Sequence, residues 1–282
     1  MAEIPQVLTE LPSRFDVAGV QISAVQLDQA AELIVRAARQ RMGGYVCVTG
    51  AHGVVECQRD PRLKDIHNAS WLTVPDGMPL VWLARLRKVP LVGRVYGPDL
   101  MRKVLMWSSA PPSAPDIAAG TPGLRHGFVG STPDVLQALE HRVRAMYPHA
   151  TIAGSWPLPF RILTGDEWTA LLSAVHIARV ELLWVGMSTP KQEQFMAEWH
   201  RRWPDHAPTE PSPVLVGVGA AFDILAGIRT DAPRWIQRSG LQWLYRLLQE
   251  PRRLGPRYLR VVPTFLWLAL RSLWSSRSRP SR

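Results

Sequence analysis

Residues 180–202 decide the fold, because the stretch VELLWVGMSTPKQEQFMAEWHRR passes from an apolar run through glycine and Thr189-Pro190 into an amphipathic run. The β-branched and aromatic residues at 180–186 predict a buried strand, and the apolar spacing at 191–202 predicts a helix. A strand that leads directly into a helix is the repeating unit of an open parallel sheet. This stretch therefore predicts an α/β protein.

The same alternation runs through the first 228 residues. A chain of 282 residues, 46% of them hydrophobic, can bury one substantial core. We predict a Rossmann-like open parallel sheet flanked by helices. The predicted strands lie at residues 45–49, 72–75, 126–130, 151–155, 180–186 and 214–217. The predicted helices lie at residues 27–41, 79–87, 134–146, 166–178 and 191–202.

The positive charge of the chain is confined to its C-terminal part. Residues 1–228 carry 21 Lys and Arg against 21 Asp and Glu, so this part is neutral. Residues 229–282 carry the remaining 12 basic residues, all arginine, against Asp231 and Glu250, which accounts for the net charge of +10. We therefore predict two domains, an α/β domain at 1–228 and a basic, Trp-rich helical appendage at 229–282.

Helical periodicity continues in the appendage, but we expect several short helices, because it is interrupted at Gly240, Pro251, Pro256 and Pro263. Its most apolar part, residues 261–274, contains an arginine and is shorter than the ~20 apolar residues that a transmembrane helix needs. Trp and Arg together are typical of helices on an anionic membrane surface. The alternative is a helical hairpin packed on the α/β domain or on another copy of the chain, as in a homo-oligomer.

The N-terminal residues show no basic stretch followed by an apolar one, so we expect no secretory signal and a protein that stays in the cytoplasm. Cys47 and Cys57 lack metal-ligand spacing and are interpreted as core thiols in a reducing compartment. Residues 108–123 are rich in Pro, Ala, Ser and Gly. We interpret them as a flexible surface loop, with an active-site lid as the alternative.

Three glycine-containing junctions follow predicted strands. Gly130-Ser131-Thr132-Pro133 and residues 186–190 each lead through Thr-Pro into a helix, which places a helix N-terminus at the carboxyl edge of the sheet. Free N–H groups and the helix dipole attract phosphate there. A structural role is the alternative, because Thr is a good N-cap and Thr189-x-x-Gln192 matches a capping box. The third junction, residues 217–223, contains Gly219 but is not a dinucleotide-binding fingerprint.

Asp76 lies on a tight turn at the end of a predicted strand, directly before Gly77. It is interpreted either as a turn residue or as a general base, which must lie within hydrogen-bond reach of the hydroxyl that it deprotonates. The sequence has no Asp-x-Asp motif, no nucleophile elbow and no Cys/His metal cluster. We therefore expect neither metal nor cofactor, with the charge of a leaving diphosphate balanced by arginine, lysine and helix N-termini.

Five stretches in register carry a resemblance to a known family. They are VPDGMPLVW (74–82), GRVYGPDL (93–100), GMSTPKQE (186–193), GVGAAFDILAG (217–227) and GLQWLYRLLQEPRR (240–253). Over roughly residues 16–260, the chain resembles the WecG/TagA/CpsF family of bacterial glycosyltransferases. The five stretches together are far more specific than any one of them.

The resemblance implies an inverting, metal-independent transfer from a UDP-sugar to a sugar on a polyprenyl diphosphate carrier, in the synthesis of a cell-surface polysaccharide or glycolipid. It implies a peripheral protein at the cytoplasmic face of the inner membrane, with 1–228 as the catalytic domain. Asp76 matches the proposed catalytic base. The resemblance and the junctions together give donor and nucleotide residues at Thr49, Arg94, Gly130, Ser131, Thr189, Gln192, Gly219 and Asp223. In the appendage, which is thought to close over the pocket, the acceptor diphosphate would meet Arg246, Arg253 and Arg257.

One departure concerns the Thr-x-Asn that many members carry after the first core strand, since this chain has Ala51 in place of the asparagine. Our hypothesis is that the neighbouring His52 takes over part of its role, or that the donor sugar differs; a structural histidine is the alternative. Lys191 is a further candidate cation. A different class of function is a membrane-surface or nucleic-acid binding protein with a non-catalytic α/β body. We favour the enzyme and expect no nucleic-acid partner, because the arginines are mixed with Trp and Leu.

Overall fold

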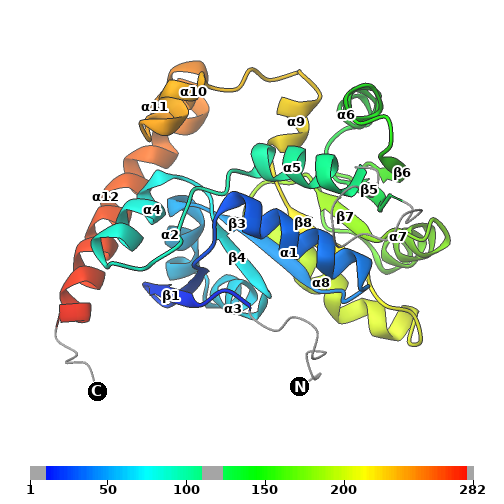
Figure 1. Ribbon diagram of the computed structural model, residues 1–282, viewed down its shortest axis with the longest axis horizontal. Helices are drawn as coiled ribbons and strands as arrows, with labels where there is room; N and C mark the ends of the chain where they lie inside the picture. The colour runs from blue at the N-terminus through cyan, green and yellow to red at the C-terminus, as the bar shows by residue number, and fades with distance from the viewer. Residues whose placement is uncertain (1–10, 110–122, 278–282) are drawn as a thin grey trace.

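The computed structural model describes residues 11–109 and 123–277, so most of the loop or lid predicted at 108–123 lies outside the described residues. Its centre is a six-stranded parallel sheet with the order β4-β3-β8-β7-β5-β6 (Figure 1). The predicted α/β fold is confirmed, and all six predicted strands are present. They are β3 (Tyr45–Thr49), β4 (Leu72–Pro75), β5 (Arg125–Val129), β6 (Thr151–Trp156), β7 (Leu182–Val185) and β8 (Val214–Gly217).

The five predicted helices are also present, and four more helices in the described residues up to 228 lie outside the predicted ranges. The predicted ones are α1 (Leu27–Arg39), α4 (Met78–Leu86), α6 (Pro133–Met146), α7 (Gly165–Ile177) and α8 (Lys191–His206). The others are α2 (Ala51–Arg59), α3 (Pro61–Ala69), α5 (Gly97–Ser109) and α9 (Ala221–Leu225). A short antiparallel hairpin, β1 (Arg14–Val17) with β2 (Val20–Ser23), precedes them and was not predicted either.

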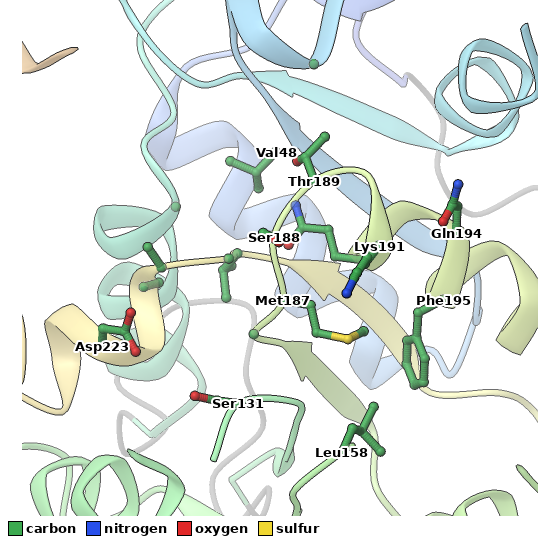
Figure 2. Close-up of a pocket in the computed structure, with 18 of the residues that line it drawn as sticks. Val48, Ser131, Leu158, Met187, Ser188, Thr189, Lys191, Gln194, Phe195 and Asp223 are labelled. Atoms are coloured by element: carbon green, nitrogen blue, oxygen red, sulfur yellow. The ribbon is translucent and has the colours of Figure 1, made fainter. Parts of the chain in front are cut away.

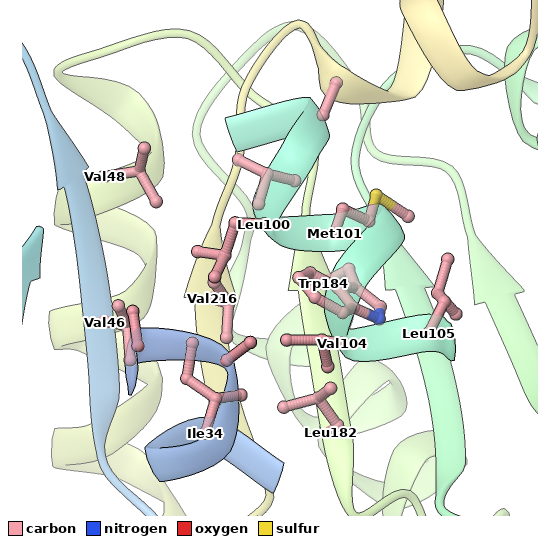
Figure 3. Packing of buried hydrophobic residues seen from close by; sticks show 14 of the residues in the cluster. Ile34, Val46, Val48, Leu100, Met101, Val104, Leu105, Leu182, Trp184 and Val216 are labelled. Carbon is pink, nitrogen blue, oxygen red and sulfur yellow. The ribbon is translucent and has the colours of Figure 1, made fainter. Parts of the chain in front are cut away.

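Strand residues alternate between the two faces of the sheet, so each central strand contributes to two cores. In β3, Val46 and Val48 belong to the core under α1 and α5, whereas Cys47 belongs to the core under α7 and α8. Figure 3 shows the first core, in which Ile34 of α1 and Leu100 of α5 pack against β3, β7 and β8. The second core is aromatic, with stacked pairs formed by Trp168 with Phe195 and by Trp199 with Trp203. This two-sided burial explains why β7 and β8 consist of apolar residues.

A third core joins residues 261–268 to elements from the first third of the chain. It contains residues of the β1–β2 hairpin, α2, α3 and α4, together with Val261, Phe265 and Leu268 near the C-terminus. These three residues recur at intervals of four and three, which places them on one face of a helix. The C-terminal helix therefore packs on the rest of the molecule along a single apolar line.

The C-terminal segment forms α10 (Arg234–Arg238), α11 (Gln242–Gln249) and α12 (Pro251–Arg277), which lie beside α2 and α4 at one end of the sheet (Figure 1). The prediction of several short helices is correct as far as Pro251 and wrong beyond it, because Pro256 and Pro263 lie inside α12. A proline in a helix interior costs ~3 kcal/mol. The apolar contacts of α12 with the third core offset this cost. We call α10–α12 the C-terminal helices and the described residues up to 228 the α/β body.

Among the described residues, no helix is long and apolar enough to cross a membrane. The outer side of α12 is nevertheless apolar in places, with Leu259, Leu266, Trp267 and Leu270 exposed. The helix therefore has one apolar line turned to the α/β body and further apolar residues turned to solvent.

Candidate active site

One large cleft, of about 1360 Å³, runs along the carboxyl edge of the sheet. The turns after β3, β4, β5, β7 and β8 line it on one side, and residues of α11 and α12 line it on the other. Figure 2 shows part of it, with Ser188 and Thr189 on the turn before α8 and Lys191 at the first residue of that helix. Ligands of open α/β sheets bind at this edge, where the order of the strands reverses.

Asp76 lines the cleft directly after β4. Its N–H donates to the Thr49 carbonyl at 2.8 Å, which fixes the turn to the end of β3. Gly77 follows with φ +116° and ψ 153°, a conformation that is essentially restricted to glycine. At Gly50, an added Cβ would lie 2.5 Å from the Asp76 carbonyl oxygen. Gly50 and Gly77 therefore allow the Asp76 carboxylate to lie at the carboxyl ends of β3 and β4.

Burial raises the pKa of the Asp76 carboxyl from its usual value of 3.8 to about 6. Arg94 and Arg246 act in the opposite direction and keep the rise from being larger. The carboxylate is therefore ionised at neutral pH but close to the pH at which it takes up a proton. A general base works best in this range.

Arg94 does not line the cleft but connects the α/β body to the C-terminal helices behind Asp76. Its guanidinium donates to Oε1 of Gln237 at 3.2 Å and to Oε1 of Gln242 at 2.8 Å. The guanidinium also lies over the Tyr96 ring, 4.3 Å from the centroid. Arg94 therefore influences Asp76 through its charge while its hydrogen bonds hold the segment around α10 and α11.

Asp231 and Glu250, the two acidic residues of the segment 229–282, make further polar contacts near the cleft. Asp231 accepts hydrogen bonds from the Tyr96 hydroxyl at 3.1 Å and from Gln242 Nε2 at 3.3 Å. Glu250 pairs with Arg229 at 3.0 Å, and the same guanidinium lies 4.0 Å from Asp223. We call this set of contacts, together with those of Arg94, the polar latch. No role was predicted from the sequence for Tyr96, Arg229, Asp231 or Glu250.

Two of the three appendage arginines of the sequence analysis, Arg246 of α11 and Arg257 of α12, line the cleft. The side chain of Arg253 lies outside the described parts of the chain. Arg257 donates to Nδ1 of His52 at 3.2 Å, and Nε2 of His52 lies 3.4 Å from a carboxylate oxygen of Glu56.

Burial and the charges of Arg257 and Arg260 lower the pKa of His52 from 6.5 to about 4. His52 is therefore neutral at physiological pH, and it accepts a hydrogen bond from Arg257 while its other nitrogen faces Glu56.

The two Thr-Pro junctions differ from each other in detail. Thr132 caps α6, because its side chain accepts from the Val135 N–H and Pro133 is the first helical residue. The capping box predicted at Thr189 is wrong, since Pro190 is the N-cap of α8 and the Thr189 hydroxyl donates to Glu193 Oε1 at 2.9 Å. Both junctions nevertheless face the cleft, as does the third one. The cleft is lined here by Ser131, Thr189, Lys191, Gln192, Gly219 and Asp223.

Two predicted donor residues lie just behind this surface. Gly130 has φ +96° and packs against the Met187 side chain, so Ser131, the next residue, is the one that reaches the cleft. Thr49 is buried at the end of β3, and its hydroxyl has no hydrogen-bond partner among the described residues. Both residues therefore support the cleft without lining it.

Sequence reasoning also missed one wall of the cleft. Residues 158–163, between β6 and α7, line it and include two strongly exposed apolar side chains, Phe160 at 82% and Ile162 at 90% exposure. The sequence LPFRIL gave no motif that would have identified this wall. Its apolar character became significant only when the fold placed it at the cleft.

No group of three or more His, Cys, Asp or Glu side chains that could hold a metal ion occurs in the described part of the chain. Cys47 and Cys57 are both buried as free thiols, in agreement with their interpretation as core residues. Burial raises the pKa of both, that of Cys57 to about 12, so neither is an activated nucleophile.

An open parallel sheet with a partly buried carboxylate and several arginines at its carboxyl edge is the arrangement of an α/β protein that binds a phosphorylated ligand. The comparison with known families agrees with this class. A family model described as "Glycosyl transferase WecG/TagA/CpsF family" matches residues 15–279, nearly the whole chain. The protein therefore belongs to this family of glycosyltransferases, which takes part in the synthesis of cell-surface polysaccharides.

Proposed function

We propose that the protein transfers a sugar from a UDP-sugar to a sugar carried on polyprenyl diphosphate, with inversion at the anomeric carbon and without a metal ion. The observation that carries this proposal is the Asp76 carboxylate, which lines the cleft with a pKa raised to about 6, in a cleft whose other wall includes Arg246 and Arg257. A base and a cationic wall in one cleft are what an attack by a hydroxyl on a diphosphate-activated carbon requires.

In the proposed reaction, a hydroxyl of the acceptor sugar attacks the anomeric carbon of the donor. The hydroxyl proton passes to the Asp76 carboxylate, a new C–O bond forms, and the C–O bond to UDP breaks on the opposite face of the ring. Charge develops on the departing diphosphate as its bond breaks. Cationic groups and helix N-termini that are already in place stabilise it without further reorganisation.

The residues at the carboxyl edge are proposed to hold the donor. Ser131, Thr189, Gln192 and Gly219 line the cleft around the N-termini of α6 and α8, where free N–H groups favour phosphate. Asp223 lies on the same side, near the nucleotide in this proposal. Lys191 is exposed at the start of α8 and would add positive charge to the rim.

The acceptor is proposed to arrive from the membrane side of the C-terminal helices. Arg246, Arg253 and Arg257 would meet its diphosphate. The exposed apolar side of α12 would rest at the cytoplasmic surface of the inner membrane, which makes the protein peripheral. Lipid, rather than a second copy of the chain, is the cover that we propose for this surface, because arginines accompany the apolar residues.

The Asp76→Asn variant tests this proposal. Transfer from UDP-sugars to a short-chain polyprenyl diphosphate-sugar should fall ~10²–10⁴-fold, the usual contribution of a general base. UDP should still raise the melting temperature of the variant, because the donor side of the cleft is unchanged. The rate of the wild-type protein should fall below pH about 6, where Asp76 takes up a proton. EDTA should leave this rate unchanged.

The same variant should be more stable than the wild-type protein at pH 7–8. Because the folded pKa of Asp76 is raised, its stabilising contribution is present below pH 3.8 and is lost as the pH rises through about 6. Removing the buried charge should therefore stabilise the fold by on the order of 2 kcal/mol. Asp65→Asn, at an exposed aspartate of α3, is the control that should change neither property. Full transfer by Asp76→Asn would refute the assignment of the base.

A further inference from the structure

Helix α8 begins with two neighbouring polar side chains that are both buried, Gln192 at 3% exposure and Glu193 at 0%. Gln192 Nε2 donates to Oε1 of Glu193 at 3.0 Å, and the Thr189 hydroxyl donates to the same oxygen at 2.9 Å. Gln192 and Thr189 line the cleft, whereas Glu193 lies behind them. The carboxylate thus holds two cleft residues from the rear.

These contacts determine which end of the Gln192 amide faces forward. A carboxylate oxygen that takes two hydrogen bonds acts as an acceptor, so the end of the amide next to Glu193 is the NH₂ group. The carbonyl oxygen Oε1 must then point away from Glu193. It lies on the side of the β8–α9 turn, since a Cβ added at Gly219, which lines the cleft, would be 3.6 Å from it.

The oxygen held in this way is buried and has no hydrogen-bond partner among the described residues. A buried acceptor without a partner costs ~1–3 kcal/mol, so native structures retain few of them. The amide cannot relieve the cost by turning over, because its NH₂ group would then lose the acceptor on Glu193. A group that donates a hydrogen bond from within the cleft would satisfy Oε1.

We infer that Glu193 is a positioning residue, which fixes Gln192 so that its carbonyl oxygen accepts a hydrogen bond from an O–H or N–H group of the bound donor. This inference rests on the proposed function for the identity of the ligand. Gln192 then recognises an uncharged O–H or N–H group of the sugar donor. The arginines on the opposite wall recognise charged diphosphate groups instead. Three parts of a UDP-sugar carry uncharged O–H or N–H groups, namely the transferred sugar, the ribose and the uracil ring.

The orientation of the amide is tested without any ligand. Side-chain amide signals in protein labelled with ¹⁵N-glutamine are compared among the wild type, Glu193→Met and Glu193→Gln, and Gln192→Met identifies the signal of Gln192 by its loss. We expect slow exchange of the Gln192 NH₂ protons with solvent in the wild type and in Glu193→Gln, which keeps an acceptor oxygen. Exchange should be fast in Glu193→Met. Fast exchange in the wild type would overturn the inference.

The role in recognition is tested by a double-mutant cycle on donor affinity, measured by calorimetry with UDP and with UDP-sugars. Gln192→Met should weaken the binding of the recognised ligand about 10-fold, the effect of one neutral hydrogen bond. Glu193→Met should do the same, and the double variant should be no weaker than either single one, because Glu193 acts through Gln192. Glu193→Gln should rescue affinity, and Gln137→Met, an exposed residue of α6, is the matched control.

Comparing the binding of UDP with the binding of UDP-sugars shows which part of the ligand donates the hydrogen bond to Gln192. A loss with UDP as large as that with the UDP-sugar assigns the group to the uridine part, that is, to the ribose or the uracil ring, and a loss confined to the UDP-sugar assigns it to the transferred sugar. Additive effects in the cycle would mean that Glu193 has a purely structural role and would overturn the inference. Wild-type protein that binds neither ligand would refute the proposed function, while the exchange measurement would still decide the orientation of the amide.

Discussion

The α/β body and the C-terminal helices bury their apolar residues to different extents. Every residue of β3, β4, β7 and β8 is buried, whereas α11 has no buried residue and α12 buries one apolar line. The sheet is thus stabilised by two full cores, and the helices are held by one line of contacts and the polar latch. The wall of the cleft that carries Arg246 and Arg257 is therefore held to the molecule by fewer buried contacts than the wall that carries Asp76.

Deleting residues 241–282 should have the largest effect, because it removes one wall of the cleft and uncovers the third core. Transfer to a lipid-linked acceptor should fall at least ~10²-fold, as expected when cationic groups at a developing charge are lost. The melting temperature should fall as well, since the hairpin, α2 and α4 lose their contacts with α12. Wild-type turnover by the truncated protein would show that the α/β body is a complete enzyme and that the C-terminal helices are not needed for transfer.

Two neighbouring residues of α12 separate its inner and outer sides. Phe265 is 6% exposed and packs in the third core, whereas Leu266 is 57% exposed. Phe265→Ala should lower the free energy of unfolding by ~3–5 kcal/mol. Leu266→Ala should change it by less than ~0.5 kcal/mol. Equal losses in chemical denaturation would mean that both sides of α12 are buried in the folded protein.

The burial of His52 beside Arg257 predicts that the contribution of this histidine to stability is lost in acid. The folded pKa of His52 is about 4, below the value of 6.5 for the unfolded chain, so the unfolded state binds more protons between these values. Stability should therefore decrease as the pH falls from 6.5 to 4, by on the order of 1–3 kcal/mol from this group. His52→Gln keeps an acceptor for Arg257 and should flatten this part of the pH profile. An unchanged profile would exclude His52 as its source.

Membrane binding should show the smallest change and should leave the fold intact. Trp267 is exposed on α12, with the Arg271 guanidinium 5.4 Å from the centre of its ring. Trp267→Ser should weaken binding to vesicles with anionic lipid severalfold, with no change in melting temperature. Ile177→Ser, at an exposed apolar residue of α7, is a matched control for the loss of an apolar surface side chain. Equal effects of the two substitutions would mean that binding does not depend on α12.

Sequence patterns predicted the sheet well because its strands are buried on both faces and form continuous apolar runs between turn residues. They missed the β1–β2 hairpin, whose strands have four residues each and are joined by Ala18 and Gly19 in left-handed conformations. The continuity of α12 through Pro256 and Pro263 could not be predicted either. It depends on contacts with the β1–β2 hairpin and α2, which are far away in the sequence and which no local pattern contains.

The candidate site was predicted in part for the same reason. Residues such as Asp76, Ser131 and Gln192 follow predicted strands, and the carboxyl ends of parallel strands meet at one edge. The capping box at Thr189 failed because Glu193, one position further along, offers the hydroxyl a buried carboxylate. A signal for the polar latch was available in the sequence, since Asp231 and Glu250 are the sole acids among twelve arginines. Asp231 holds that segment to the α/β body through Tyr96, and Glu250 pairs with Arg229, whose guanidinium lies 4.0 Å from Asp223.

The close approach at Gly50 limits how the sequence around the base can vary. An added methyl group there would lie 2.5 Å from the backbone of Asp76, while its neighbour at position 51 is an alanine with part of its surface exposed. In a library randomised over positions 50 and 51, active clones should retain glycine at the first position and accept several residues at the second. Attempts to alter donor choice by restoring an asparagine at position 51 can therefore proceed without disturbing the base, provided that residue 50 is left as it is.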